Sequence, residues 1–314
     1  REVVLFRTDT GEVACVDAYC PHMGAHFGHG GTVEGDQLRC PFHFFEFNTQ
    51  GVCTRTGYGT KPPKKCRVKT WPVRERNHQL MVYYDRKAEA PTWEVPALDT
   101  EGWLAPEFGS WRVKTHPQET TENSVDVGHF GIVHRYFDVE ECSPLHTEGP
   151  YLSTHYAFSR VNDVFGGPAS VRTEFRTHVW GLGYSLVELT VQGLGLRSRV
   201  WVLPTPTGTE HIELRAGLSV PADTDVGALH WGLRLMPRAV ALSLVQRRSF
   251  ATYTHDLKQD FDIWENKVYI HPPTLAQGDG PIPKYRKWAR QFYPELRVAP
   301  MPQHDEGELS LVPS

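Results

Sequence analysis

Two cysteines and two histidines near the start of the chain have the types and spacing of iron–sulfur ligands. The pattern is Cys-Pro-His followed, after a gap, by Cys-Pro-Phe-His. Two thiolates on one iron and two neutral imidazoles on the other can ligate a [2Fe–2S] cluster, and the imidazoles raise its reduction potential above that of an all-thiolate cluster. The pattern therefore predicts a centre that handles single electrons. Its expected ligands are Cys20, His22, Cys40 and His43.

The same four side chains could instead hold a structural zinc ion. However, the order Cys-x-His then Cys-x-x-His differs from the paired-cysteine and paired-histidine spacing of zinc modules. Each of the two cysteines is also followed by proline. We therefore interpret the motif as the mixed thiolate and imidazole ligation known as the Rieske arrangement.

A second group of metal-ligand side chains lies in residues 122–134, which read Glu-Asn-x-x-Asp-x-x-His-x4-His. Two histidines and a carboxylate with open positions form the facial triad of non-haem Fe(II) oxygenases. Asp126 and His129 share a helical face, but His129 and His134 lie about 140° apart on an ideal helix. They converge on one metal only if the helix is overwound, bulged or ending there. The alternative is an ordinary helix with two unrelated histidines.

The carboxylate that completes this second site must come from elsewhere in the chain. The best candidate is Asp260, which sits late in an expected long helix. Asp256 lies one turn earlier, and Asp262 points roughly 200° away if the helix is regular. The alternative for each of them is a solvated helix face, so residue type and position alone leave the choice open.

Length and composition limit the class of protein. The 314 residues suffice for about two domains, and the net charge of −4 gives no nucleic-acid footprint. No apolar run reaches the ~18 residues of a transmembrane segment. Four cysteines outside the cluster motif have no pairing pattern, and we expect reduced, mostly buried thiols in a cytoplasmic protein. These are Cys15, Cys53, Cys66 and Cys142.

The order of strand and helix signals divides the chain into three parts. Residues 1–85 carry short β signals between Gly and Pro turns and predict a Rieske domain. Residues 86–106 are rich in proline and predict a surface linker. Residues 107–314 predict the catalytic domain, with a helical stretch at 224–266 that is interrupted near Pro237. Strand-like alternation occurs at 151–159, 170–179, 184–192, 198–203 and 211–220.

This order predicts an α+β fold, with an all-β N-terminal domain and a C-terminal antiparallel sheet wrapped by helices, of the helix-grip type. The concave face of such a sheet is available for a ligand. Residues 1–7 run straight into a hairpin turn. We interpret them as a strand entered midway, and we expect more chain upstream.

On both motifs the chain resembles the Rieske non-haem iron oxygenases, the α subunits of ring-hydroxylating oxygenases. The resemblance extends from residue 1 to about residue 293. It implies that the four Cys and His residues bind the cluster and that His129 and His134 bind iron. The distal aspartate of the family often follows glutamine, as in Gln259-Asp260, which favours Asp260 as the third ligand.

The resemblance also implies a role for Asp126. In such enzymes the equivalent carboxylate hydrogen-bonds a cluster histidine of a neighbouring subunit and an iron-ligating histidine of its own. Asp126 would then bridge His43 of one chain and His129 of another, and the chains would form a head-to-tail homotrimer.

The more specific resemblance is to steroid-active members, the ketosteroid 9α-hydroxylase oxygenase component and the cholesterol 7-desaturases. It implies a ferredoxin or flavin reductase that passes electrons from NAD(P)H, O2 as co-substrate, and monooxygenation of a bulky apolar ring substrate. Desaturation, demethylation and aromatic dioxygenation use the same metals and remain alternatives. A Rieske electron carrier is the alternative of another class, but it would need only about the first hundred residues. The steroid resemblance rests on segments 16–24, 31–35, 69–72, 91–96, 259–267 and 279–281.

Two features of the chain bear on the cluster surface and the substrate. Phe44 and Phe45 follow His43, where the family often has Gly-Trp or Asp-Trp; no ligand is lost. We expect the large strand side chains of the catalytic domain to be core more often than substrate wall, namely Phe158, Phe165, Phe175, Trp180, Leu186 and Trp201. A substrate carboxylate could be served by Arg172, Arg176, Arg197 or Arg199.

Overall fold

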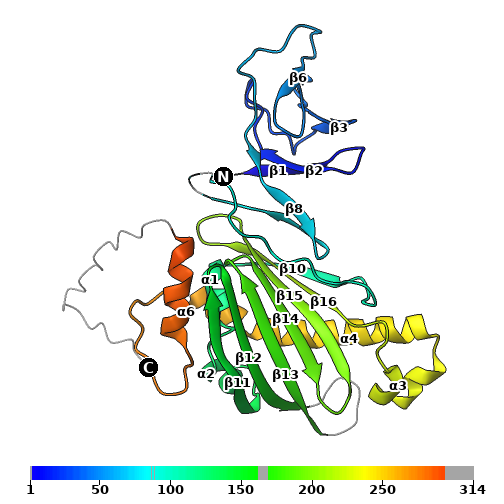
Figure 1. The fold of residues 1–314 in the computed structure, drawn as a ribbon, viewed down its shortest axis with the longest axis vertical. Coiled ribbons are helices and arrows are strands. Elements are labelled where there is room, and N and C mark those ends of the chain that lie inside the picture. Colours follow the sequence, from blue (N-terminus) through cyan, green and yellow to red (C-terminus); the bar gives the residue numbers. More distant parts are fainter. Residues whose placement is uncertain (1, 86, 88, 162–168, 294–314) are drawn as a thin grey trace, which may run out of the picture.

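The N-terminal part of the chain is built from short strands, as expected. The computed structural model describes residues 2–85, 87, 89–161 and 169–293. One sheet has the strand order β1-β2-β7, and a second has the order β3-β4-β5-β6. Both lie in the blue upper part of Figure 1, with the cysteine loops between their strands. The strands are β1 (Val3–Arg7), β2 (Val13–Asp17), β3 (Thr32–Glu34), β4 (Gln37–Arg39), β5 (Glu46–Phe47), β6 (Cys53–Arg55) and β7 (Thr70–Trp71).

A hairpin of β8 (Val73–Arg76) and β9 (Gln79–Val82) connects this part to the rest. Its turn residue Asn77 is buried and donates to the Pro96 carbonyl and to the Tyr184 hydroxyl, both at 2.9 Å. The described residues between β9 and residue 106 form no helix or strand. The hairpin turn is thus fixed against both this segment and the large sheet. The boundaries at residues 85 and 107 stay a prediction.

The described catalytic part contains a seven-stranded antiparallel sheet of order β10-β16-β15-β14-β13-β12-β11. The five strands predicted from alternation are present. The two edge strands, β10 and β11, were not predicted. For β11 the reason is that it is exposed along most of its length and carries register shifts. The strands are β10 (Glu107–Val113), β11 (Phe137–Glu148), β12 (Tyr151–Val161), β13 (Ser170–Trp180), β14 (Tyr184–Val191), β15 (Leu196–Pro206) and β16 (Ile212–Ser219).

A long helix, α4 (Arg238–Gln259), runs across one face of this sheet (Figure 1). The expected helical stretch at 224–266 is divided into α3 (Val226–Leu229), η1 (Trp231–Leu235), α4 and α5 (Phe261–Asn266). The predicted interruption near Pro237 is confirmed, since this proline caps the start of α4. Along β13 the buried residues alternate with more exposed ones, so one face of the strand is packed against the interior of the domain.

Short helices close the end of the sheet next to β11 and β12 (Figure 1). They are α1 (Pro117–Glu122), α2 (Gly128–Ile132), α6 (Ile282–Ala289) and η2 (Arg290–Phe292). Among the described residues, no helix is long and apolar enough to cross a membrane.

All six cysteines lie in the described residues and are free thiols. Cys15 and Cys53 are buried and Cys66 is partly buried, in line with the prediction. Cys142 is the exception and is exposed, because it lies on the edge strand β11.

Candidate functional site: two metal centres and a cavity

The two Cys-Pro loops have the same backbone construction. In the first, the Gly24 amide donates to the Cys20 carbonyl at 2.9 Å; in the second, the Phe44 amide donates to the Cys40 carbonyl at 3.1 Å. Both cysteines are 2% exposed, and they are close enough for Cys40 to raise the pKa of Cys20. The two loops therefore present their thiols at one buried point.

The two histidines of these loops lie beside each other near the surface. The rings of His22 and His43 have centroids 4.8 Å apart. Within the described residues, Nδ1 of His43 is buried and has no hydrogen-bond partner. Burial raises the pKa of Cys20 to about 12, so a metal is needed to hold this side chain as a thiolate at neutral pH. The unpartnered nitrogen and the adjacent thiols fit a mixed-ligand [2Fe–2S] cluster.

Phe44 occupies a strained position in the second loop. Its φ is +53°, and the equivalent Gly24 in the first loop has a φ of +76°. A bulky residue with positive φ is an outlier, whereas glycine and, to a lesser degree, aspartate tolerate this region. The family preference for Gly or Asp at this place therefore has a backbone reason, and this chain accommodates Phe44 there at a cost in strain.

His129, His134 and Asp260 come together at a second point, with one ligand atom from each lying within 4.8 Å of the others. His129 lies in α2, whereas His134 lies beyond its last residue, Ile132. The chain then turns at Arg135, which has a φ of +57°. Of the three possibilities left open by the spacing, the helix therefore ends between the two histidines.

Each histidine of this group is oriented through Nδ1. Nδ1 of His134 donates to the side-chain oxygen of Gln259 at 3.0 Å, and Nδ1 of His129 donates to the Asp126 carbonyl at 2.5 Å. Nε2 of His134 is 3.6 Å from Oδ2 of Asp260. A metal-binding histidine characteristically donates its other ring nitrogen to such a partner, so the group fits a mononuclear iron.

The three aspartates considered for the third ligand have different surroundings. Asp260 is 5% exposed, and burial raises the pKa of its carboxyl against the opposing effect of the two histidines. Asp256 instead accepts hydrogen bonds from Tyr136 and Arg160, and Asp262 is exposed on α5. Only Asp260 is brought to the two histidines.

Asp126 precedes α2, and its side chain is more exposed than that of His129. Its Oδ1 is 3.8 Å from Nδ1 of His129, and its side chain is 38% exposed. Burial raises the pKa of the Asp126 carboxyl, but hydrogen bonds and charge from His129 outweigh this and leave the pKa lowered. The carboxylate is thus ionised and accessible from outside.

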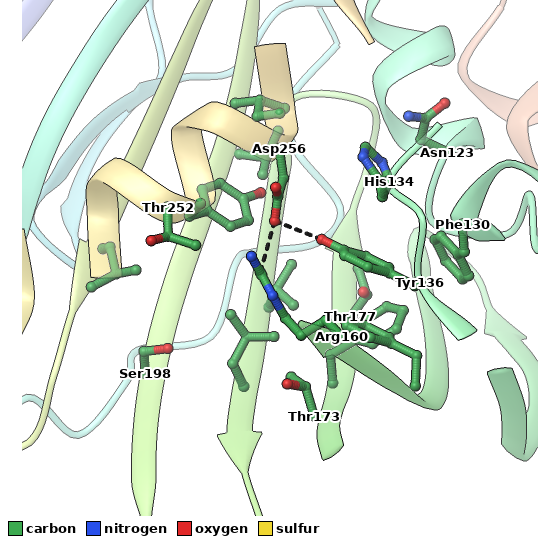
Figure 2. Close-up of a pocket in the computed structure, with 18 of the residues that line it drawn as sticks. Asn123, Phe130, His134, Tyr136, Arg160, Thr173, Thr177, Ser198, Thr252 and Asp256 are labelled. Atoms are coloured by element: carbon green, nitrogen blue, oxygen red, sulfur yellow. Dashed lines mark hydrogen bonds and ion pairs between the residues drawn. The ribbon is translucent and has the colours of Figure 1, made fainter. Parts of the chain in front are cut away.

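A cavity of about 230 Å³ lies between the sheet and α4, with the three candidate iron ligands in its wall. Figure 2 shows side chains from β12, β13 and α4 converging on it. Phe158 and Phe175 pack in a core cluster and also line the cavity, so the expectation that they are core is incomplete. The apolar wall consists of Phe130, Phe158, Val161, Val171, Phe175, Val187, Leu189, Val191, Leu194, Leu196, Val202, Leu218, Leu257 and Trp264.

Other large side chains that were expected in the core do not line the cavity. Trp180, Leu186 and Trp201 pack together in a separate core cluster, as predicted. Phe165 lies outside the described residues.

The four arginines suggested for a substrate carboxylate do not line the described cavity, so that prediction is wrong. Strand alternation puts them on other surfaces. Arg172 pairs with Glu140, Arg197 pairs with Asp223, Arg176 contacts His155, and Arg199 donates to the Asp99 carbonyl.

Sequence reasoning missed Arg160, the arginine that does line the cavity. It donates to Oδ2 of Asp256 at 2.8 Å, and the Tyr136 hydroxyl donates to the same oxygen at 2.7 Å (Figure 2). The signal was present, because the period-two alternation of β12 places Arg160 on the same face as Phe158.

Two family descriptions match the chain. Residues 82–293 match the 3-ketosteroid 9alpha-hydroxylase C-terminal domain, and residues 1–72 match the Rieske [2Fe-2S] domain. Together they cover nearly all of the described chain.

Curated relatives include enzymes named for steroids. The chain is 28% identical to the cholesterol 7-desaturase of Caenorhabditis elegans, over 93% of this chain and 70% of the relative. It is 30% identical to cholesterol 7-desaturase nvd 1 of Ciona intestinalis, over 93% and 63%. It is 28% identical to the 3-ketosteroid-9-alpha-monooxygenase oxygenase component of Rhodococcus rhodochrous, over 98% and 82%.

Solved structures share the fold. NdmA of Pseudomonas putida CBB5 with caffeine has a TM-score of 0.66 at 16% identity, covering 92% of this chain and 80% of that one. Dicamba monooxygenase bound to dicamba has a TM-score of 0.63 at 18% identity, covering 92% and 89%. At these identities the likeness concerns the fold alone.

Proposed function

The chain belongs to the Rieske oxygenases that carry the 3-ketosteroid 9α-hydroxylase C-terminal domain, and from this membership we propose that it hydroxylates a steroid as a terminal oxygenase component. It is an oxidoreductase with a Rieske [2Fe–2S] domain, and its relatives work with mononuclear iron, O2 and electrons supplied by a reductase. What is proposed is the substrate, the type of oxidation, the site residues and the assembly.

The observation that carries the proposal is the apolar cavity with His129, His134 and Asp260 in its wall. An apolar ring system loses its unfavourable contact with water when it enters such a space. The curated relatives named above include enzymes whose names specify cholesterol or a 3-ketosteroid. A steroid is therefore the substrate class that agrees best with both the apolar lining of the cavity and the names of the curated relatives.

We assign the iron to His129, His134 and Asp260. Two imidazoles and one carboxylate leave positions open on a ferrous ion, which supplies oxygen activation when bound. The Gln259 side chain and the Asp126 carbonyl fix the two imidazole rings through Nδ1, so that each Nε2 is available for the metal. The aromatic and aliphatic wall holds the ring substrate beside these ligands and excludes water.

We assign the cluster to Cys20, His22, Cys40 and His43, where it supplies single electrons when bound. We propose that electrons pass between the two kinds of centre across the boundary between neighbouring chains. On this proposal the chains form a head-to-tail homotrimer, in which the Asp126 carboxylate accepts a hydrogen bond from His43 of a neighbouring chain. Within its own chain, the Asp126 carbonyl accepts from the His129 ring and its carboxylate accepts from the His129 amide. The exposed carboxylate beside His129 supports this role.

Desaturation, demethylation and aromatic dioxygenation stay as alternatives on the same metals. A carrier that only transfers electrons would have no use for the cavity or for the second group of ligands. The relatives named as cholesterol 7-desaturases make desaturation the strongest of these alternatives.

The test is oxygen consumption by the iron-loaded protein with a surrogate reductase and NADH, in the presence of candidate steroids and aromatic acids. Hydroxylation is expected to add one oxygen atom to a steroid, and desaturation would remove two hydrogen atoms instead, which mass spectrometry distinguishes. Consumption that never depends on a ring compound, together with iron bound only at the cluster, would show a carrier.

A further inference from the structure

The cavity contains an ion pair that the metal sites do not use. Side chains of Arg160 on β12 and Asp256 on α4 are 20% and 13% exposed, and they meet at 2.8 Å. The Tyr136 hydroxyl donates to the same carboxylate at 2.7 Å and completes the group, which we call the polar cluster. This cluster lies in an otherwise largely apolar wall.

The polar cluster lies close to the candidate iron ligands along the chain. Asp256 precedes Asp260 by four residues on α4, which is about one helical turn or ~6 Å of rise. Tyr136 follows His134 by two residues, and its ring is centred 5.2 Å from that of His134. A substrate group held by the polar cluster would therefore be near the point of oxidation.

The hydrogen bonds within the polar cluster leave one carboxylate oxygen available. Tyr136 and Arg160 both donate to Oδ2 of Asp256. Across the part of the chain that the structure describes, no donor is recorded for Oδ1 of Asp256. A carboxylate is an acceptor only, and this one lines the cavity, so it suits a group that donates a hydrogen bond.

The polar cluster offers no uncompensated positive charge to an anionic ligand. The charge of Arg160 is already compensated by Asp256. A substrate carboxylate would have to approach Asp256 and share its arginine, whereas a neutral hydroxyl needs only to donate to it.

We propose that Oδ1 of Asp256 accepts a hydrogen bond from a hydroxyl group of the substrate, and that the substrate is an uncharged ring alcohol whose hydroxyl lies near the attacked carbon. This inference rests on the proposed function and narrows it. It selects a sterol-like alcohol over the corresponding ketone, since a ketone has no hydrogen to donate.

Binding of matched steroids to the iron-loaded protein without reductant tests the proposal. The probes are steroids of one nucleus that carry a hydroxyl, a keto group, a carboxylate or only hydrogen at the same ring carbon, with each end of the nucleus substituted in turn. We expect the alcohol at one end to bind about tenfold or more tightly than the other three, because its partner is a buried charged acceptor.

An Asp256→Asn variant sharpens the test. Tyr136 and Arg160 both donate to one oxygen, so the amide oxygen must take that place and the amide nitrogen must occupy the other. The cavity then offers a hydrogen-bond donor, from which the oxygen of an alcohol and that of a ketone can both accept, so the preference for the alcohol over the ketone is expected to be lost. Asp262→Asn on α5 is the matched control, because Asp262 is exposed, and it should keep the preference for the alcohol.

The outcomes separate the inference from the function on which it rests. Equal affinities of the wild-type protein for the alcohol and the unsubstituted steroid overturn the inference alone, provided that either compound stimulates oxygen consumption. If no ring compound binds, the proposed function fails and the inference fails with it. If Asp256→Asn does not fold, the comparison of the four probes with the wild-type protein still decides.

Discussion

Nε2 of His134 lies 3.6 Å from Oδ2 of Asp260, although His134 follows the short helix α2 and Asp260 ends the long helix α4. Both side chains are nearly buried, at 8% and 7% exposed. Burying a carboxylate is unfavourable unless it is paired or bound to a cation. The proximity of these two residues therefore joins two distant segments into one candidate metal site.

Removal of the Asp260 carboxylate should empty this site and spare the cluster. We expect Asp260→Ala to lose mononuclear iron and steroid-dependent oxygen consumption, because the remaining imidazoles are too few to hold ferrous iron. Iron analysis and the spectrum of the cluster measure the two centres separately. Asp262→Ala, on the exposed side of α5, should retain both. Full mononuclear iron in Asp260→Ala would mean that another residue is the third ligand.

The hydrogen bond from His134 to Gln259 leads to a second expectation. Without the acceptor at 3.0 Å, the imidazole is free to rotate or change tautomer. We expect Gln259→Leu to weaken iron affinity by roughly 10- to 100-fold, measured by chelator competition. Gln259→Glu keeps an acceptor oxygen and should restore most of the affinity. Equal weakening in both variants would point to a packing role.

The candidate residues of both centres could be proposed from the sequence, but their convergence could not. The chain reversal at Arg135 depends on backbone dihedral angles that cannot be read from the sequence. The spacing of His129 and His134 was therefore compatible with a helix that is overwound, bulged or ending. Alternation located five strands, because each has one buried face. It failed for β11, an edge strand exposed on both sides. The polar cluster was missed because only the fold brings β12 to α4.

The proposed role of Asp126 predicts a variant that keeps its metals and loses its turnover. Asp126→Asn preserves shape but weakens the hydrogen bonds of a charged acceptor. We expect iron content at both centres to be unchanged, and steroid-dependent turnover to fall at least about tenfold. Rapid mixing with reduced reductase should show normal reduction of the cluster, followed by slow reoxidation in the presence of substrate and O2. Normal reoxidation would exclude Asp126 from the electron path.

The positive φ of Phe44 predicts a stabilising substitution. Left-handed backbone costs roughly 1–2 kcal/mol for an ordinary L-residue, and asparagine tolerates it better than phenylalanine. We expect Phe44→Asn to stabilise the Rieske domain by about 1 kcal/mol in chemical denaturation. Phe42→Asn is the matched control, since Phe42 is similarly exposed but is not among the residues with positive φ. We expect no stabilisation in Phe42→Asn. The same stabilisation in both variants would mean that replacing an exposed phenylalanine by a polar residue, and not relief of backbone strain, causes the effect.

A buried ion pair fixes the turn that delivers Asp126 to His129. Arg286 on α6 donates from two nitrogens to the two carboxylate oxygens of Glu122, at 2.8 and 2.7 Å, and the side chains are 10% and 8% exposed. The Glu122 carbonyl in turn accepts from the Asp126 amide at 3.1 Å. The pair therefore anchors the segment that carries Asp126 and His129 to the C-terminal helix.

Removing one partner of this ion pair should lower the free energy of unfolding more than removing both partners. Arg286→Met leaves the Glu122 carboxylate buried without its partner, so we expect a loss of about 3–5 kcal/mol in the free energy of unfolding. The double variant Glu122→Leu with Arg286→Met removes both charges and should recover a large part of that loss. Chemical denaturation of the wild-type, both single and the double variants gives the coupling energy. Single-variant costs below about 1 kcal/mol, the range of surface pairs, would contradict a buried pair. Because the turn at Asp126 depends on this anchor, the single variants should also lower turnover more than they lower cluster content.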